Sequence, residues 1–378
     1  MHRLPRSVGA LQQDLRVGAK GLPGGGEHGF APTSIEERRA EFRFELPYLL
    51  AQRCLGQMQV CGSTGEIALP SGFEEVFELV EFHRFFRPSS SESTVLPATR
   101  KLIQSSLMSR LCVHTITTKP LNFEQCLAEF PKRGVTGITI WRQALEGRDL
   151  ATVKRQTADS GMEVVSLCRG GFFPSATSAG RQAAIDDNLK AIEQAHAIGA
   201  PLIVLVCGAV PGQSLVESRK QIADGIAAIL PAAEQAGVKL AIEPLHPMYA
   251  DDRSAVNTMR QSHEICDALG SPKSLGIAVD VYHVWWDPEL KEQIDLAGLT
   301  GRLHAFHICD WKTPTTDLLN DRGLMGEGCI NIREISDWVD ATGFTGHREV
   351  EIFSNHWWGT DRHVFLDKIA ASYARLYA

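Results

Sequence analysis

The chain has 378 residues, of which 44% are hydrophobic and 22% are charged, and its formal net charge is −7. This composition is that of an ordinary globular protein and excludes collagen-like, disulfide-scaffold and low-complexity chains. Residues 1–108 contain equal numbers of acidic and basic side chains, so the negative charge falls on the remainder, which argues against a domain that tracks a nucleic-acid backbone.

The first part of the chain carries no chemical motif. Residues 1–33 are rich in Gly, Pro and Arg without hydrophobic periodicity, which indicates a flexible segment. Helices are predicted over residues 34–56, where a Ser N-cap precedes a Glu at capping-box spacing, and over residues 73–86. We expect residues 1–108 to be an N-terminal extension that is partly disordered or helical, and Met108 to be an alternative native start.

From residue 109 onward, short apolar runs alternate with amphipathic segments of helical length. The runs are continuous or β-branched, as expected for strands that are covered on both faces. The eight runs span residues 111–116, 137–141, 163–168, 202–207, 238–243, 275–280, 303–309 and 348–353.

The segments between the runs have the pattern of helices. Residues 188–200 and 218–238 have apolar residues at helical spacing and contain a glycine suited to a left-handed cap near the end. A final helix is predicted over residues 365–378. Eight strands that each lead into a helix predict an α/β fold, a (β/α)₈ TIM barrel over residues 109–378.

Four consecutive predicted strands deliver an ionisable residue at the same end: Glu243, Asp280, His307 and Glu351. Reacting groups in such barrels come from the C-terminal ends of strands, and charges in apolar runs are costly to bury unless they are paired or bind a metal. Three carboxylates and one imidazole suit one divalent ion, Mn²⁺ or Mg²⁺ first and Co²⁺ or Zn²⁺ as alternatives. Glu349 competes with Glu351, because alternate residues face the same way, but Glu351 is nearer the mouth.

Five motifs carry a resemblance to a known family. They are EPLHP, VDVYHVWWDP, HICDW, RGLMGEG and EVEIFS, which begin at residues 243, 279, 307, 322 and 349. Residues 109–378 resemble the xylose isomerase-like TIM barrel superfamily, which is labelled sugar phosphate isomerase/epimerase and includes AP endonuclease family 2.

The resemblance implies specific roles for residues of these motifs. It makes Glu243, Asp280, His307 and Glu351 the metal ligands, which are the same four that end the strands, and it makes His283 a substrate contact. A metal-dependent isomerase or epimerase of a sugar or sugar phosphate would transfer a proton through a metal-stabilised enediolate. We expect Glu243 and Glu351 to be the catalytic pair that removes and returns the proton.

Residues near the predicted mouth are candidates for substrate binding. Arg322 could meet an anionic group or form a surface salt bridge, and Asp310 could orient a metal ligand or cap a helix. The tryptophans could stack on a sugar or form a dimer contact. The predicted substrate contacts are His283, His246, Arg322, Trp285 and Trp311.

Three other functions share this scaffold. A lyase that dehydrates a polyol or a cyclic keto-acid is the main alternative, because the four ligands do not distinguish it from an isomerase. An AP endonuclease would need more metal ligands, and a non-catalytic sugar-binding protein would not need the intact set. We expect a small carbohydrate as partner, no nucleic acid and no membrane, and a homo-oligomer stays open.

The nine cysteines indicate the compartment. Their number is odd, no C-x-x-C is present, and several fall in apolar runs. They fit buried thiols of a reducing environment better than a disulfide set, so we expect a cytoplasmic protein.

Overall fold

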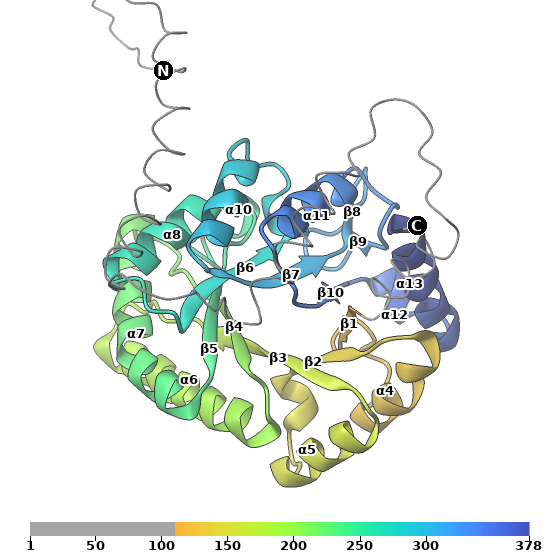
Figure 1. The fold of residues 1–378 in the computed structure, drawn as a ribbon. Coiled ribbons are helices and arrows are strands. Elements are labelled where there is room, and N and C mark those ends of the chain that lie inside the picture. The colour runs from red at the N-terminus through yellow and green to blue at the C-terminus, as the bar shows by residue number, and fades with distance from the viewer. Residues whose placement is uncertain (1–109, 378) are drawn as a thin grey trace, which may run out of the picture. The chain divides into compact units, whose positions relative to one another are not determined.

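The computed structural model describes residues 110–377, which form a closed barrel of eight parallel strands surrounded by helices (Figure 1). The predicted (β/α)₈ fold is thereby confirmed. The helices predicted over residues 34–56 and 73–86 lie outside the described residues. The barrel strands are β1 (Leu111–His114), β2 (Gly137–Trp141), β3 (Glu163–Gly171), β4 (Leu202–Val206), β5 (Lys239–Glu243), β6 (Leu275–Asp280), β7 (Leu303–Ile308) and β10 (Arg348–Val350).

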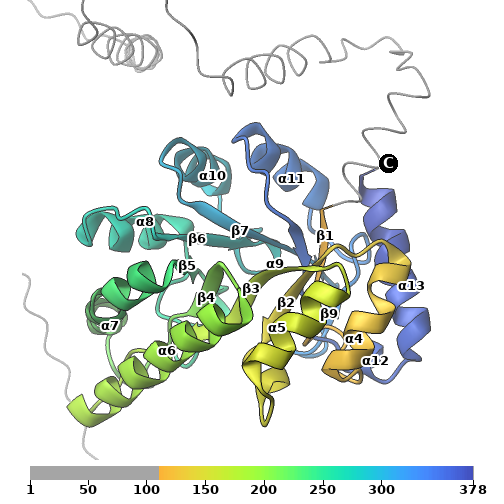
Figure 2. The ribbon, with the colours of Figure 1, turned by 60° about the horizontal axis from the view of Figure 1, so that its bottom comes forward.

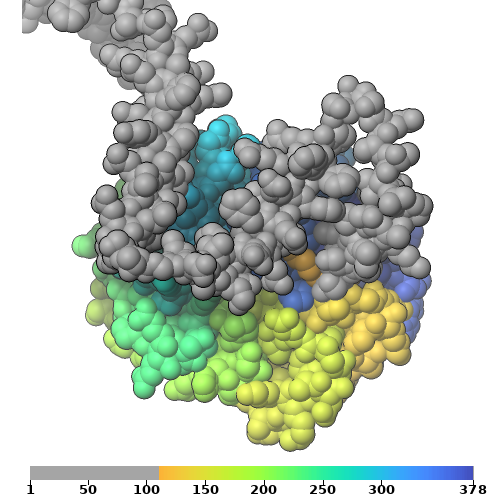
Figure 3. Space-filling view, viewed as in Figure 1, coloured from red at the N-terminus to blue at the C-terminus, as the bar shows by residue number. Residues whose placement is uncertain are grey.

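Helices follow the strands and form an outer ring. Around this ring the colours pass from yellow through green to blue (Figure 2), and the yellow and green parts form the lower surface of the space-filling view (Figure 3). The longer helices are α4 (Phe123–Glu129), α5 (Leu150–Asp159), α6 (Ser178–Ile198), α7 (Leu215–Ala236), α8 (Met259–Ala268), α10 (Leu290–Leu299), α11 (Ile332–Ala341) and α13 (Arg362–Leu376). Short helices are α9 (Val281–Val284), α12 (Asn355–Trp358) and the 3₁₀ turns η1 (Pro131–Arg133), η2 (Arg142–Leu145) and η3 (Pro247–Tyr249).

Two of the strand ends that differ from the prediction can be explained by their contacts. β3 continues beyond residue 168, because Gly170 and Gly171 pair with β4 although they lack the apolar side chains that define a run. β10 ends at Val350 instead of residue 353. There the Ile352 amide donates to the Thr117 hydroxyl rather than to a neighbouring strand, so the ladder stops.

The helix caps explain where α6 and α7 begin and end. Thr177 and Ser214 accept hydrogen bonds from amides of the first turn, so both helices begin before their predicted starts. The first ten residues of α6 contain one large apolar side chain, Ile185, among small and polar residues, so the apolar pattern did not reveal them. Gly199 and Gly237 end the helices in the left-handed conformation, with φ of 79° and 67°.

Small residues line part of the barrel interior below the mouth. Ala241, Ala278 and Ala305 are fully buried there and belong to one interior cluster with Trp141 and Cys168. Each alanine stands two positions before an ionisable strand-end residue and therefore faces the same side. Small side chains at this level leave room along the barrel axis for polar groups.

A two-stranded antiparallel sheet extends from the β7 end of the barrel. It pairs β8 (Asp310–Trp311) with β9 (Arg322–Gly323), and Trp311 lies opposite Arg322. This hairpin returns Arg322 towards the barrel strands. Among the described helices, none is long and apolar enough to cross a membrane.

Candidate metal centre and active site

The four strand-end residues meet at one point. Glu243 ends β5, Asp280 ends β6, His307 is the penultimate residue of β7, and Glu351 follows β10 directly. These strands are neighbours in the order β10, β7, β6, β5. One nitrogen or oxygen from each side chain lies within 4.8 Å of the others, and all four residues are buried. The structure therefore brings together the complete set that the sequence predicted.

Several atoms of this cluster have no hydrogen-bond partner. His307 Nδ1 lies 3.0 Å from Glu243 Oε1 and 3.9 Å from Glu351 Oε2, yet neither His307 Nδ1 nor Glu243 Oε1 has a hydrogen-bond partner among the described residues. A buried polar atom without a partner is costly. Atoms that converge without bonding one another have the arrangement of ligands around a cation, so the residues fit a divalent metal.

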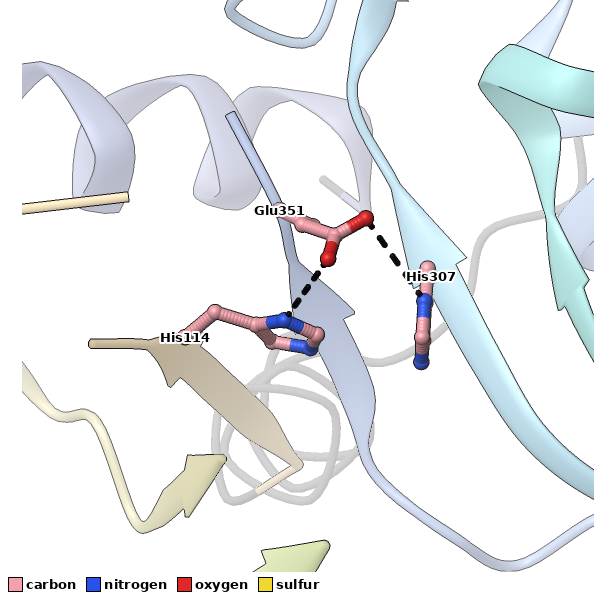
Figure 4. Close-up of side chains that lie close together, drawn as sticks. All are labelled: His114, His307 and Glu351. Atoms are coloured by element: carbon pink, nitrogen blue, oxygen red, sulfur yellow. Dashed lines mark ion pairs between the residues drawn. The ribbon is translucent and has the colours of Figure 1, made fainter. Parts of the chain in front are cut away.

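His114 of β1 joins the cluster, and sequence reasoning assigned it no role. Its Nδ1 lies 3.2 Å from Glu351 Oε1, and its ring centroid lies 4.8 Å from that of His307. Figure 4 shows the Glu351 carboxylate between the two imidazoles. The signal in the sequence was a single histidine in the first apolar run, which is by itself unspecific.

Glu349 lies inside the barrel, two positions before Glu351 and below the cluster. Its Oε2 accepts hydrogen bonds from Thr139 Oγ1 at 2.5 Å and Ser166 Oγ at 3.1 Å, and it lies 3.2 Å from His114 Nε2. Burial alone would raise the pKa of Glu349, but His307, His114 and Thr139 outweigh it and lower the pKa to about 2. Glu349 is therefore an anion that supports the histidines from beneath.

The carboxylates act on both imidazoles. Burial lowers the pKa of His114 and of His307, yet Glu351 and Glu349 beside His114, and Glu349 and Glu243 beside His307, raise each pKa to about 9. The cause is a concentration of negative charge in a buried space. A bound cation would balance the same charge.

Arg322 lies within this charge cluster. Its Nη1 donates to Asp280 Oδ2 and Glu351 Oε2, both at 2.9 Å, and its Nη2 lies 3.0 Å from His283 Nε2. Burial raises the pKa of Asp280 to about 7, against the lowering effect of Arg322. The guanidinium is buried, so the surface salt bridge considered for it is wrong, and contact of Arg322 with a substrate stays a prediction.

His283 stands on α9, one turn after Asp280. Its Nδ1 accepts a hydrogen bond from the His246 amide at 3.3 Å, and burial together with Arg322 lowers the pKa of His283 well below its usual value. A neutral imidazole is consistent with a ring whose Nδ1 accepts and whose Nε2 faces a guanidinium. His283 is thus held next to the cluster by two neighbours.

Aromatic rings form one wall beside His283. Tyr282 stacks on Trp311 with ring centroids 4.7 Å apart, while His246 and Trp285 approach the same indole at 4.9 and 5.7 Å. The Trp285 indole N–H is buried without a partner in the described part of the chain. The structure therefore gathers the predicted contacts His246, Trp285 and Trp311, and their binding to a substrate stays a prediction.

Asp310 does neither of the two things considered for it. Its carboxylate accepts hydrogen bonds from the backbone amides of Trp311, Gly326 and Ile330, at 2.9, 2.9 and 3.0 Å, whereas α11 is capped by Asn331. Asp310 therefore fixes the loop that follows β9.

Comparisons with known proteins identify the family of the barrel. Residues 127–370 match the family described as xylose isomerase-like TIM barrel. The crystal structure of protein SMc04130 from Sinorhizobium meliloti 1021 is 43% identical, with a TM-score of 0.68, and the match covers 71% of this chain and 98% of that one. No curated protein matches the chain.

Two more distant structures share the fold. The IolI protein with a bound zinc atom is 22% identical with a TM-score of 0.62, over 71% of this chain and 98% of that one. L-ribulose 3-epimerase is 19% identical with a TM-score of 0.59, and the match covers 69% of this chain and 92% of that one. The family match covers most of the barrel, and the structure of SMc04130 is similar along nearly its whole length. The chain therefore belongs to the xylose isomerase-like TIM barrel family.

Proposed function

We propose that this protein is a metal-dependent isomerase or epimerase of a sugar or sugar derivative. The observation that carries the proposal is the convergence of Glu243, Asp280, His307 and Glu351 within 4.8 Å at one end of the barrel. The distant relatives that are named sugar epimerases support the same class of reaction.

The donor atoms favour a hard divalent ion. Three carboxylates and one imidazole suit Mn²⁺ or Mg²⁺, and Co²⁺ and Zn²⁺ also accept such ligands. When bound, the metal would polarise a carbonyl and offset the negative charge that develops on the substrate. The bound zinc of the IolI structure is consistent with a divalent ion on this fold.

We assign proton transfer from opposite sides to Glu243 and Glu351. Glu243 ends β5 and Glu351 follows β10, the outer two of the four neighbouring strands, and Asp280 and His307 lie on the strands between them. Each carboxylate has two oxygens, so one can face the metal while the other accepts or returns a proton. Epimerisation needs a base on each side of the reacting carbon, and this pair supplies both.

The remaining groups position the substrate and the pair. Arg322 holds Asp280 and Glu351 in place through hydrogen bonds, and His283 presents a neutral imidazole beside them. Trp311, which is partly exposed and stacks on the buried Tyr282, is the aromatic ring that we assign to the apolar side of a sugar.

The first test is metal content, because it does not require knowledge of the substrate. We expect about one Mn, Mg, Co or Zn ion per chain in the native protein, and none in an Asp280→Ala/His307→Ala double variant. The matched control is Asp159→Ala/His356→Ala, two exposed residues outside the cluster, which should keep the metal. Absence of metal from the native protein after Mn²⁺ is supplied would refute the proposal.

The second test identifies the reaction. Ketoses and inososes incubated with the enzyme in D₂O should exchange the hydrogen next to the carbonyl and give an isomer or epimer. Loss of water from the substrate would instead identify the lyase.

A further inference from the structure

Two arginines near the active site lack a counter-ion in the described part of the chain. Arg169 of β3 and Arg253, which follows η3, form no hydrogen bond or ion pair through their guanidinium groups with any described residue. Their contacts are with aromatic faces, Arg169 with Phe172 at 4.2 Å and Arg253 with Tyr249 at 5.6 Å. Asp251 precedes Arg253 by two positions but is exposed and does not pair with it. Both side chains are partly exposed, so their guanidinium groups are accessible to an anion.

The two side chains belong to one region of the mouth. Phe172, under the Arg169 guanidinium, lies against Gly208, where an added Cβ would come within 2.8 Å of Phe172 Cα. The Gly208 amide in turn donates to the Arg253 carbonyl at 2.9 Å. A chain of direct contacts thus joins the two arginines across the ends of β3 and β4.

The same region adjoins the candidate metal centre. Arg169 lies 6.0 Å from the ring of Trp141, whose indole N–H donates to His114 Nδ1 at 3.2 Å. Tyr249, under Arg253, lies 5.8 Å from the His283 ring. Burial lowers the pKa of Arg169, and the like charge of Arg253 lowers it further.

Neither cation has a carboxylate of its own. Glu243 and Glu351 act on Arg169 electrostatically, but both belong to the candidate metal cluster, and Glu351 also accepts from Arg322. Arg169 and Arg253 then add two positive charges on the β3–β5 side, with no carboxylate of the described residues paired to either. Guanidinium groups bind phosphate and carboxylate oxygens in two-point contacts.

We propose that Arg169 and Arg253 form an anion subsite that binds a phosphate or carboxylate group of the substrate, at the end remote from the reacting carbon. The substrate would then be a sugar phosphate or a sugar acid rather than a neutral sugar. The assignment to a sugar rests on the proposed function, whereas the anion subsite itself does not.

Anion binding can be measured without turnover. Inorganic phosphate and glycolate would be titrated into the full-length protein by calorimetry, and into the Arg169→Gln, Arg253→Gln and Arg169→Lys variants. Each Gln variant should weaken binding by about tenfold or more, and the Lys variant, which keeps the charge, should weaken it less. Arg142→Gln is the control, because Arg142 is nearby but already paired with Asp187 at 2.6 Å.

The relative affinities distinguish the two sources of the anion. Tighter phosphate binding identifies a sugar phosphate, and tighter glycolate binding identifies a sugar acid. No saturable binding to the parent protein, or equal affinity in Arg169→Gln and Arg142→Gln, would overturn the subsite. Thermal melting of each variant excludes unfolding as the cause.

The outcome separates this inference from the proposed function. Anion binding that depends on Arg169 and Arg253, without any isomerisation, would support the anion subsite and refute the proposed isomerase function. Isomerisation of neutral ketoses, with no anion binding, would remove only the subsite. If both hold, kcat/KM for an anionic ketose should fall in Arg169→Gln, while that for its neutral counterpart changes little.

Discussion

At the scale of single residues, Glu351 is the most connected member of the cluster. It faces His114 at 3.2 Å and accepts from Arg322 at 2.9 Å, so its position is fixed from two sides. Burial raises the pKa of Glu351, but Arg322 and His114 outweigh it and hold the pKa well below the usual value. Glu351 is therefore an ionised carboxylate in a fixed position, although the same lowered pKa makes it a weaker base than an ordinary glutamate.

Replacing Glu351 with Gln tests this role. The amide keeps the shape of the side chain but cannot accept the proton, so kcat/KM should fall by about 10²–10⁴-fold while the protein stays folded. Steady-state kinetics and circular dichroism measure the two properties. Glu146→Gln, at an exposed position, should behave as the parent enzyme, and full activity in Glu351→Gln would remove Glu351 from the mechanism.

The sequence predicted some site residues and missed others for a physical reason. Glu243 and Asp280 end apolar runs, where a charge is conspicuous. Glu349 was considered but placed second, and only the folded barrel reveals that Thr139 and His114 surround it. These partners come from strands that are more than 200 residues away in the chain, so no local pattern could connect them.

At the scale of elements, strand β7 carries a histidine on each side. His307 faces the cluster, whereas the ring of His304 packs against Gly276. A Cβ atom added to Gly276 would come within 2.5 Å of that ring. Burial, and then the charge of Lys239, lower the pKa of His304 to about 4. This folded-state pKa lies below the ordinary value of 6.5, so protonation opposes folding.

The stability contribution of neutral His304 is full above pH 6.5 and is lost as the pH falls towards 4. Between those limits the free energy of unfolding of the parent protein should fall by about 2–3 kcal/mol because of this residue. Urea unfolding at pH 7.5 and pH 5 should show a smaller loss for His304→Gln than for the parent. Equal losses in both proteins would contradict the prediction, and His356→Gln, at an exposed position, serves as the control.

The loop after β9 depends on one buried carboxylate. Because Asp310 accepts from three backbone amides, Asp310→Ala should lower the free energy of unfolding by about 3 kcal/mol. Asp317, which accepts from two amides in a more exposed turn, is the matched control, and its Ala variant should lose less than about 1 kcal/mol. Chemical denaturation measures both, and similar losses would show that Asp310 does not anchor the loop.

At the scale of the whole molecule, the sequence predicted the barrel because parallel strands under helices are continuous apolar runs. The eight runs 111–116 to 348–353 all contain observed strands. The hairpin of β8 and β9 was not predicted, since strands of two residues have no periodicity. It is nevertheless this hairpin that brings Arg322 onto Asp280 and Glu351.

The barrel closes within the described residues, because β1 pairs with both β2 and β10. The candidate metal ligands also lie on, or directly after, strands β5, β6, β7 and β10. We therefore predict that a chain starting at Met108 folds, binds the metal and keeps its activity to within about twofold. Thermal melting, elemental analysis and kinetics beside the full-length protein test this. A chain starting after residue 116 lacks β1 and should not fold, and an unfolded product from the Met108 chain would mean that residues 1–107 are part of the stable structure.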